Sequence, residues 1–241
     1  MHTKRILAIF AHPDDEFTSA GLITRLINAD SEICLVCATK GEAGRIRNTK
    51  TELDHQIEIS KIREKEFINS CEHLKINEYY FLDLIDGQST DWNIEKTIDK
   101  IMDMIRHFNP TYLISFDKHG GNGHPDHREI SKITHAIHNQ LNGTKLIQVS
   151  RYPTKFIQNK LWWLPRKIKL KIMSKVCRND LENFKIVKLS RKELKSKMKL
   201  IDIYISQFPD EKNRYFGQPR FILKLLGKYE CYEIGRASCR E

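Results

Sequence analysis

Short apolar runs alternate with amphipathic stretches through the first two thirds of the chain. Apolar residues recur at helical spacing over roughly 17–28, 54–71, 94–107 and 125–140, which predicts four helices. The apolar runs near these stretches are short and bounded by polar or turn residues, which is typical of strands. The predicted strands are Ile6–Phe10, Ile33–Ala38, Tyr79–Leu82 and Tyr112–Phe116.

The alternation of strands and helices predicts the α/β fold class. We expect a Rossmann-like three-layer sandwich, in which helices cover both faces of a mostly parallel sheet. Ligands in such folds bind outside the carboxyl ends of the strands. We therefore expect any metal site at that edge of the sheet.

Beyond Gln148 the alternation weakens, and basic and aromatic residues are mixed most densely over residues 156–176. A stretch of this kind can lie on an anionic membrane surface or contact a phosphate-bearing substrate. A covering helix or loop with a solvated face explains it equally well, because aromatic side chains pack more often than they bind ligands. The sequence leaves both interpretations open.

Length and composition are those of an ordinary globular protein. The 241 residues suffice for a sizeable core, and we expect a single domain over residues 1–233. Hydrophobic residues make up 40% and charged residues 30%, and no run approaches the roughly 20 apolar residues of a membrane helix. The first residues do not resemble a secretory leader. We therefore expect a cytoplasmic location.

Six cysteines are scattered along the chain and do not suggest a disulfide framework. Cys34 and Cys37 have the C-x-x-C spacing found in redox and zinc motifs. They lie within a predicted strand, however, where residues three apart point to opposite faces. We expect both to be buried strand residues rather than a redox or zinc pair.

Residues 234–241 look foreign to the rest of the chain. In one back-translation they resemble the start of a common sequencing-library adapter, so we expect an adapter-derived, non-native tail. A natural polar tail is the alternative. The formal net charge is +10 with these residues and +9 without their two arginines and one glutamate, so the chain is basic in either case.

Two motifs rich in imidazole and carboxylate groups follow predicted strands. Residues 12–16 read His-Pro-Asp-Asp-Glu after the first strand, and residues 124–127 read His-Pro-Asp-His after the fourth. As metal ligands, His12, Asp15 and His127 would leave one open position for water. On zinc, the pKa of that water falls to about 7, so hydroxide becomes available at neutral pH. The sequence therefore predicts metal-assisted hydrolysis.

The remaining acids and bases of the two motifs have catalytic roles in this interpretation. Asp14 is the expected general base, because it adjoins a ligand without being needed as one. We expect His124 to stabilise an oxyanion or protonate a departing amine, with Asp126 orienting its ring and favouring its charged form. Each residue also has an ordinary explanation, since aspartates in such places often cap the following helix.

The chain resembles the PIG-L/LmbE family of zinc-dependent N-deacetylases over roughly residues 4–140. The resemblance rests on the motifs at residues 12–16, 41–44 (Gly-Glu-Ala-Gly) and 123–127, and it is weak around Ser206-Gln207. It implies removal of an acetyl group from an N-acetylglucosamine-type sugar, often within a glycoconjugate or small thiol precursor.

By motif position, the resemblance gives the zinc-ligand roles to His12, Asp15 and His127. It gives the base to Asp14, the electrostatic stabiliser or acid to His124, and the orienting role to Asp126. Arg63 and Asp86 resemble substrate contacts, although a helix-surface charge and a turn residue explain them equally well. Some relatives have a tyrosine where this chain has Asn122, which can donate an amide hydrogen bond to substrate but cannot act as an acid.

Two alternatives to the zinc deacetylase remain from the sequence. Two histidines and one carboxylate also suit a non-haem iron enzyme, although an oxygenase does not need a base such as Asp14 beside its ligand. The basic charge, with Trp162 and Trp163 among lysines, permits a noncatalytic nucleic-acid-binding module. That module would leave the histidine motifs unexplained, so we expect no nucleic-acid partner. The sequence does not indicate an oligomeric state.

Overall fold

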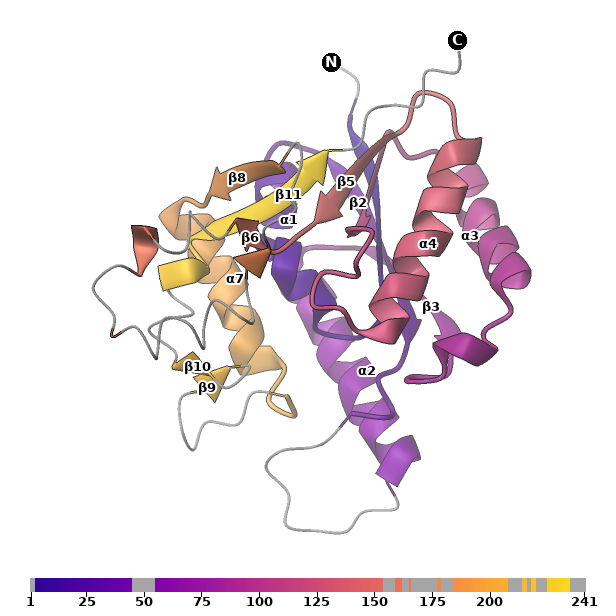
Figure 1. Ribbon diagram of the computed structural model, residues 1–241, viewed down its shortest axis with the longest axis horizontal. Coiled ribbons are helices and arrows are strands. Elements are labelled where there is room, and N and C mark those ends of the chain that lie inside the picture. Colours follow the sequence, from indigo (N-terminus) through magenta and orange to yellow (C-terminus); the bar gives the residue numbers. More distant parts are fainter. Residues whose placement is uncertain are drawn as a thin grey trace.

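The computed structural model describes residues 3–44, 55–153, 159–161, 165, 177–178, 184–207, 214–215, 218–219 and 225–234. A seven-stranded sheet in the order β3-β2-β1-β4-β5-β11-β8 forms its centre (Figure 1). Neighbouring strands from β3 through β5 are parallel, whereas β11 is antiparallel to both β5 and β8. The sheet is therefore mostly parallel, as the sequence predicts.

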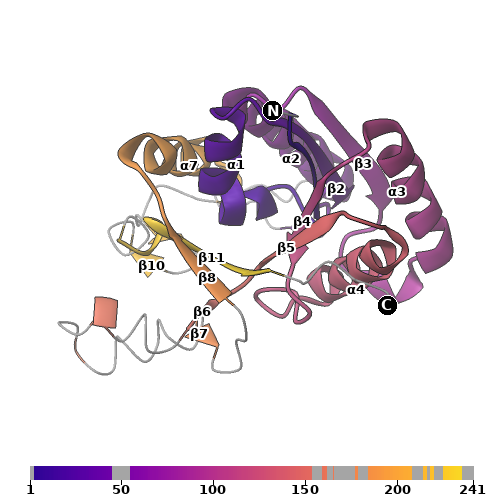
Figure 2. The same cartoon turned by 90° about the horizontal axis from the view of Figure 1, so that it is seen from above.

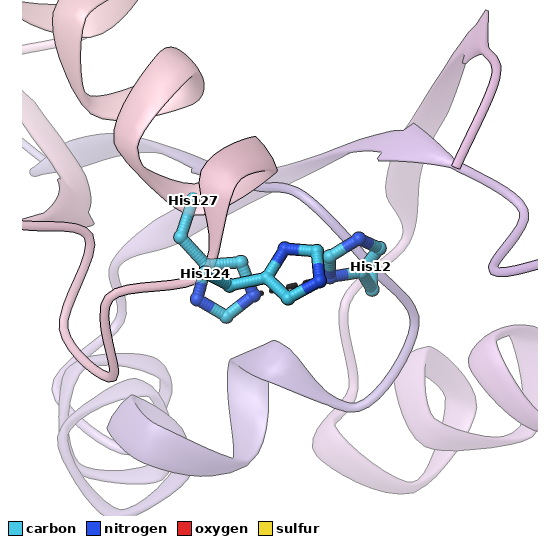
Figure 3. A group of neighbouring side chains, drawn as sticks. All are labelled: His12, His124 and His127. Carbon is cyan, nitrogen blue, oxygen red and sulfur yellow. Dashed lines mark hydrogen bonds between the residues drawn. The ribbon is translucent and has the colours of Figure 1, made fainter. Parts of the chain in front are cut away.

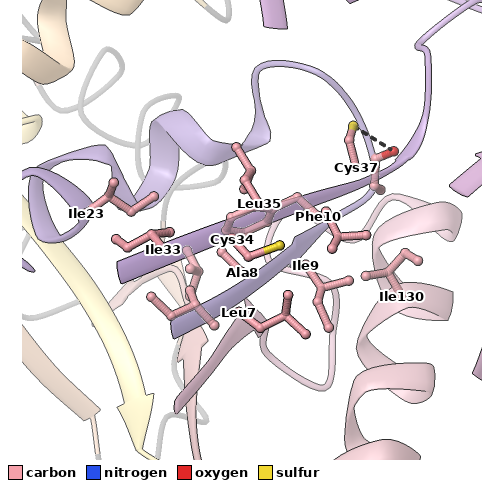
Figure 4. Packing of buried hydrophobic residues seen from close by; sticks show 14 of the residues in the cluster. Leu7, Ala8, Ile9, Phe10, Ile23, Ile33, Cys34, Leu35, Cys37 and Ile130 are labelled. Atoms are coloured by element: carbon pink, nitrogen blue, oxygen red, sulfur yellow. Dashed lines mark hydrogen bonds between the residues drawn. The ribbon is translucent and has the colours of Figure 1, made fainter. Parts of the chain in front are cut away.

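The strands of this sheet are β1 (Arg5–Phe10), β2 (Glu32–Thr39), β3 (Glu78–Leu84), β4 (Tyr112–Phe116), β5 (Lys145–Val149), β8 (Phe184–Lys188) and β11 (Tyr229–Ile234). β1 and β2 are buried along almost their whole length, because helices cover both faces of the sheet. Their continuous apolar sequences are what a central parallel strand requires. Figure 4 shows these side chains packed against Ile23 on one side and Ile130 on the other.

Helices form the outer layers (Figure 2). On one face lie α3 (Ile94–Phe108) and α4 (Pro125–Gln140), and on the other lie α1 (Ala20–Ile27), α2 (His55–Leu74) and α7 (Arg191–Ile203). Two 3-10 helices, η1 (Asp15–Ser19) and η2 (Ser89–Asp91), lie in loops that follow β1 and β3. The three-layer α/β architecture predicted from the sequence is confirmed.

Shorter strands form two separate pairs. β6 (Tyr152–Pro153) pairs with β7 (Cys177–Arg178), and β9 (Arg214–Tyr215) pairs with β10 (Gln218–Pro219). Most of the basic and aromatic stretch at 156–176 lies outside the described residues, so its role stays a prediction. None of the described helices is long and apolar enough to cross a membrane.

Cys34 and Cys37 lie unpaired in the buried β2, as expected, and Figure 4 shows both among core side chains. Ile234 ends β11 opposite Ile147, and residues 235–241 lie outside the described residues. The non-native tail and the single domain over 1–233 therefore stay predictions.

Candidate active site

The two predicted motifs meet at the carboxyl edge of the sheet, on the loops that follow β1 and β4. After β1, the backbone N–H of His12 donates to Asp15 Oδ2 at 2.7 Å, and the N–H of Asp15 donates back to the His12 carbonyl at 3.2 Å. These two bonds close a tight turn that leads into η1. The turn holds the His12 and Asp15 side chains together on a buried loop.

The second motif starts helix α4. His124 is its N-cap, and the His124 Nδ1 atom accepts from the backbone N–H of Asp126 at 3.3 Å, while Pro125 occupies the first turn, where no N–H is needed. This helix start directs His127 into the sheet edge, where its ring stacks on Phe116 with the ring centroids 4.1 Å apart. Figure 3 shows the rings of His12, His124 and His127 gathered at this point.

Potential ligand atoms of three residues converge between the motifs. His12 Nδ1 lies 3.1 Å from His127 Nε2 and 3.4 Å from Asp15 Oδ2, and His127 Nε2 lies 3.2 Å from Asp15 Oδ1. Two ligands that each lie 2.0–2.1 Å from a tetrahedral zinc ion are about 3.3 Å apart. The spacing of the three donors therefore fits one small cation.

The other ring nitrogens have partners that fix the tautomers of these histidines. His12 Nε2 lies 3.1 Å from Asp126 Oδ2 and 2.9 Å from Asp86 Oδ1, and His127 Nδ1 lies 3.2 Å from the Gly120 carbonyl. Carboxylate and carbonyl oxygens only accept, so these nitrogens carry the hydrogens. In the neutral rings, the two nitrogens that face each other are then left with lone pairs, as metal ligands require.

The electrostatics favour a positive charge at this place. Burial alone would lower the pKa of His12, but hydrogen bonds to Asp126, Asp15 and Asp86 raise it well above its ordinary value. Burial would raise the pKa of Asp15, but His127 and His12 hold it well below its usual range. A carboxylate kept ionised between two imidazoles is a suitable place for a metal cation.

Two further donor combinations lie in the same region. Ligand atoms of His12, His124 and His127 all lie within 4.8 Å of one another, as do those of His12, Asp86 and Asp126. The first combination places His124 at the edge of the same candidate centre. The second combination surrounds His12 Nε2. This nitrogen is hydrogen-bonded, not metal-bound, if His12 Nδ1 is the ligand atom.

Asp14 adjoins Asp15 in the sequence, and its carboxylate interacts electrostatically with Asp15 and His12. Burial raises its pKa to about 7, against the opposing effect of Arg63, whose Nη2 atom lies 3.4 Å from Asp14 Oδ1 and also donates to the Pro13 carbonyl. Gly41 and Gly44 make room for this guanidinium, since a Cβ at Gly41 would lie 2.4 Å from Arg63 Nε and one at Gly44 2.5 Å from Nη1. The glycines at residues 41–44 thus form a cradle for Arg63.

The predicted substrate contacts have partners within the protein. Asp86 Oδ1 contacts His12, and Asp86 Oδ2 accepts from the Ala43 N–H at 3.1 Å. The Asp86 N–H in turn donates to Glu42 Oε1 at 2.8 Å. Asn122 is exposed, and its side-chain oxygen accepts from the His124 N–H at 2.9 Å. In this structure Asp86 and Asn122 organise the loops around the site. Contact with substrate stays a prediction for Arg63, Asp86 and Asn122.

The Asp126 side chain acts on two histidines of the site. The Asp126 carboxylate contacts His12 and accepts from the Gly87 N–H at 2.8 Å, so its hydrogen bonds orient His12. Its charge does raise the pKa of His124, but partial desolvation, His12 and His127 outweigh it, and the pKa of His124 is lowered. Asp126 thus favours the charged form of His124, as expected, although the net shift has the opposite direction, and its role in orienting the His124 ring stays a prediction.

Fold and site together define an α/β protein with a candidate His/Asp metal centre at the carboxyl edge of its sheet. Residues 7–138 match the family model described as PIG-L: GlcNAc-PI de-N-acetylase. This match covers more than half of the chain, so the protein belongs to the PIG-L family.

Individual relatives agree with this assignment. The chain is 29% identical to a mycothiol S-conjugate amidase from Streptomyces coelicolor over 66% of its length and 60% of that protein. It is 34% identical to a probable N-acetylglucosaminyl-phosphatidylinositol de-N-acetylase from Dictyostelium discoideum over 53% of its length and 47% of that protein. The chain thus spans about half to three fifths of these curated relatives.

The fold also matches a solved structure, that of an N,N'-diacetylchitobiose deacetylase from Pyrococcus horikoshii. The TM-score is 0.63 at 20% sequence identity, and the match covers 96% of this chain and 84% of the other. At this identity, the likeness establishes the common fold.

Proposed function

We propose that this protein is a zinc-dependent N-deacetylase that removes the acetyl group from an N-acetylglucosamine-type sugar or glycoconjugate. The observation that carries the proposal is the convergence of two imidazole nitrogens and one carboxylate at 3.1–3.4 Å, with Asp14, which contacts Arg63, next to Asp15 in the sequence. The names of the family model and of the relatives, which are amidases and sugar deacetylases, supply the substrate class.

His12, Asp15 and His127 would hold the ion, which supplies a Lewis acid that polarises the amide carbonyl and lowers the pKa of water. Asp14 accepts a proton from the attacking water and returns it to the departing amine nitrogen as the C–N bond breaks. His124 would stabilise the developing oxyanion by donating a hydrogen bond.

The test is acetate release by the purified protein from a panel of N-acetylglucosaminides, after loading with zinc or with ferrous iron. Zinc-dependent acetate release supports the proposal. Activity that requires iron and oxygen would instead favour the oxygenase alternative. Salt-sensitive binding of DNA or RNA without any acetate release would favour the nucleic-acid-binding module.

Two substitutions separate binding of the metal from catalysis. Asp14→Asn removes the base but none of the predicted ligands, so we expect bound zinc to remain while kcat falls by about 10²- to 10⁴-fold. His12→Ala removes a ligand, so we expect zinc to be lost together with activity. Metal content by atomic emission, measured beside kcat, checks both expectations. Loss of zinc from Asp14→Asn would contradict the assigned roles.

A further inference from the structure

A buried carboxylate lies behind the loop that carries Asp14. Glu16 is 1% exposed, and its Oε2 atom accepts from the backbone N–H of Asp14 at 3.1 Å. Its Oε1 atom accepts from Ser70 Oγ on α2 and from the Tyr204 hydroxyl at the end of α7, both at 2.5 Å. Three distant parts of the chain thus meet on one side chain that touches the backbone of Asp14.

The backbone of Asp14 has a conformation that few residues with a side chain adopt. Its φ of 95° and ψ of −16° lie in the left-handed region. Asp14 begins η1 without a side-chain hydrogen bond that would cap this helix. Backbone angles of this kind persist where the surroundings impose them, and the bond from the Asp14 N–H to Glu16 is one such constraint.

Tyr204 is fixed from the opposite end of the chain. Its side chain is fully buried, and it follows the last turn of α7, which packs against α1 and α2. Two residues further on, Ser206 donates from its N–H and its hydroxyl to Glu66 of α2, at 2.8 and 2.6 Å. The end of α7 is thereby attached to α2, and the Tyr204 hydroxyl is held against Glu16.

We propose that Tyr204 and Glu16 are positioning residues for Asp14, and that their hydrogen bonds hold its backbone in the left-handed conformation from which its carboxylate acts in the proposed reaction. Tyr204 lies outside the matched residues 7–138, so the C-terminal part of the chain completes the site. The catalytic consequence rests on the proposed function, in which Asp14 is the base.

The test compares Tyr204→Phe with Tyr232→Phe in the zinc-loaded full chain. Tyr232 is a matched control, because its buried hydroxyl donates to the buried Glu230 Oε2 at 2.6 Å without contact to Asp14. We expect both variants to lower Tm similarly and to keep wild-type zinc affinity in a competition with a chromogenic chelator. We expect kcat to fall by about 10- to 100-fold in Tyr204→Phe alone, with KM little changed, because misplacement of a catalytic group acts on the chemical step.

The backbone amide resonance of Asp14 in a ¹⁵N-labelled sample gives a readout that does not depend on activity. We expect it to shift in Tyr204→Phe and to stay in place in Tyr232→Phe. If Tyr204→Phe does not fold, Ser70→Ala removes the other donor to Glu16 Oε1 and is expected to show the same shift and the same fall in kcat.

Equal kcat and an unmoved Asp14 resonance in folded Tyr204→Phe would overturn the positioning role. A wild-type protein that releases no acetate from any substrate would contradict the proposed function instead. In that case the amide resonance still decides whether Tyr204 controls the backbone at Asp14.

Discussion

At the scale of single residues, the ionisation of Asp14 is set by two opposing effects, burial and the charge of Arg63. Burial raises its pKa to about 7, and the guanidinium of Arg63 works in the opposite direction. Arg63 is itself buried, with its position maintained by the space that Gly41 leaves. The arginine therefore tunes the carboxylate as well as contacting the loop.

This balance predicts the pH dependence of the reaction. A general base accepts a proton only when it is ionised, so we expect kcat/KM for acetate release to rise with pH through about 7 and then to level off. Arg63→Gln removes the charge that lowers the pKa of Asp14, so the rising limb moves to higher pH. Arg25→Gln serves as the control, because Arg25 pairs with Glu193, away from the site. A limb that moves equally in both variants would contradict the role given to Arg63.

At the scale of elements, sequence patterns located the first four strands and helices. Each of these elements has apolar residues at regular spacing within one short stretch of sequence. The same patterns did not locate β5, β8 or β11. β8 lies at the edge of the sheet and is largely exposed or half-buried, so it lacks an apolar run. β11 contains Glu230, a carboxylate that is 1% exposed and paired with Lys197, and this charge interrupts its apolar pattern.

Helix α7 starts with a capping box, which gives a prediction for stability. Ser190 Oγ accepts from the Glu193 N–H at 3.3 Å, and Glu193 Oε2 accepts from the Ser190 N–H at 2.7 Å. We expect Ser190→Ala to lower the free energy of unfolding by about 1 kcal/mol, and Tm by roughly 2–4 °C. Ser60→Ala, within α2, is the control and should change the free energy by less than about 0.5 kcal/mol. If the wild type and Ser190→Ala had the same melting curve, the capping box would not contribute to stability.

The acidic side of the same cap adds a pH dependence to stability. The Arg25 guanidinium donates to both carboxylate oxygens of Glu193 and lowers its pKa. A lowered pKa in the folded state means that this stabilisation is present above the usual glutamate pKa of about 4.3 and is lost as pH falls. Thermal melts of wild type and Glu193→Gln are therefore expected to converge at acidic pH. A difference in Tm that stays constant from pH 7 down would contradict this.

At the scale of the whole molecule, the site depends on contacts that no local pattern reveals. The motifs at residues 12–16 and 124–127 were visible because each is contiguous in sequence and follows a strand. Tyr204 and Glu16 are 188 residues apart, and only the weak family resemblance around Ser206-Gln207 lies near Tyr204 in the sequence. Glu230 makes a second such connection, since it accepts from the N–H groups of Gly21 and Leu22 on α1, each at 2.9 Å, and thereby joins β11 to the N-terminal half.

These connections predict that the chain unfolds as one unit. Lys197 Nζ donates to Glu230 Oε1 at 2.8 Å with both side chains almost fully buried, so Lys197→Met leaves a buried charge without its partner. Breaking such a pair costs about 3–5 kcal/mol. Lys199→Met, the same change on the same helix, removes only an exposed pair with Asp202 at 3.6 Å and should cost about 1 kcal/mol or less.

Urea denaturation followed by far-UV circular dichroism and by zinc release tests this expectation. In Lys197→Met both signals should move together to a lower midpoint, because α7 and β11 stabilise the same folded unit that holds the candidate metal centre. If circular dichroism alone shifted while zinc release kept its wild-type midpoint, the C-terminal elements would unfold independently. The single-domain prediction would then be wrong, and with it the argument that α7 holds Asp14 in place.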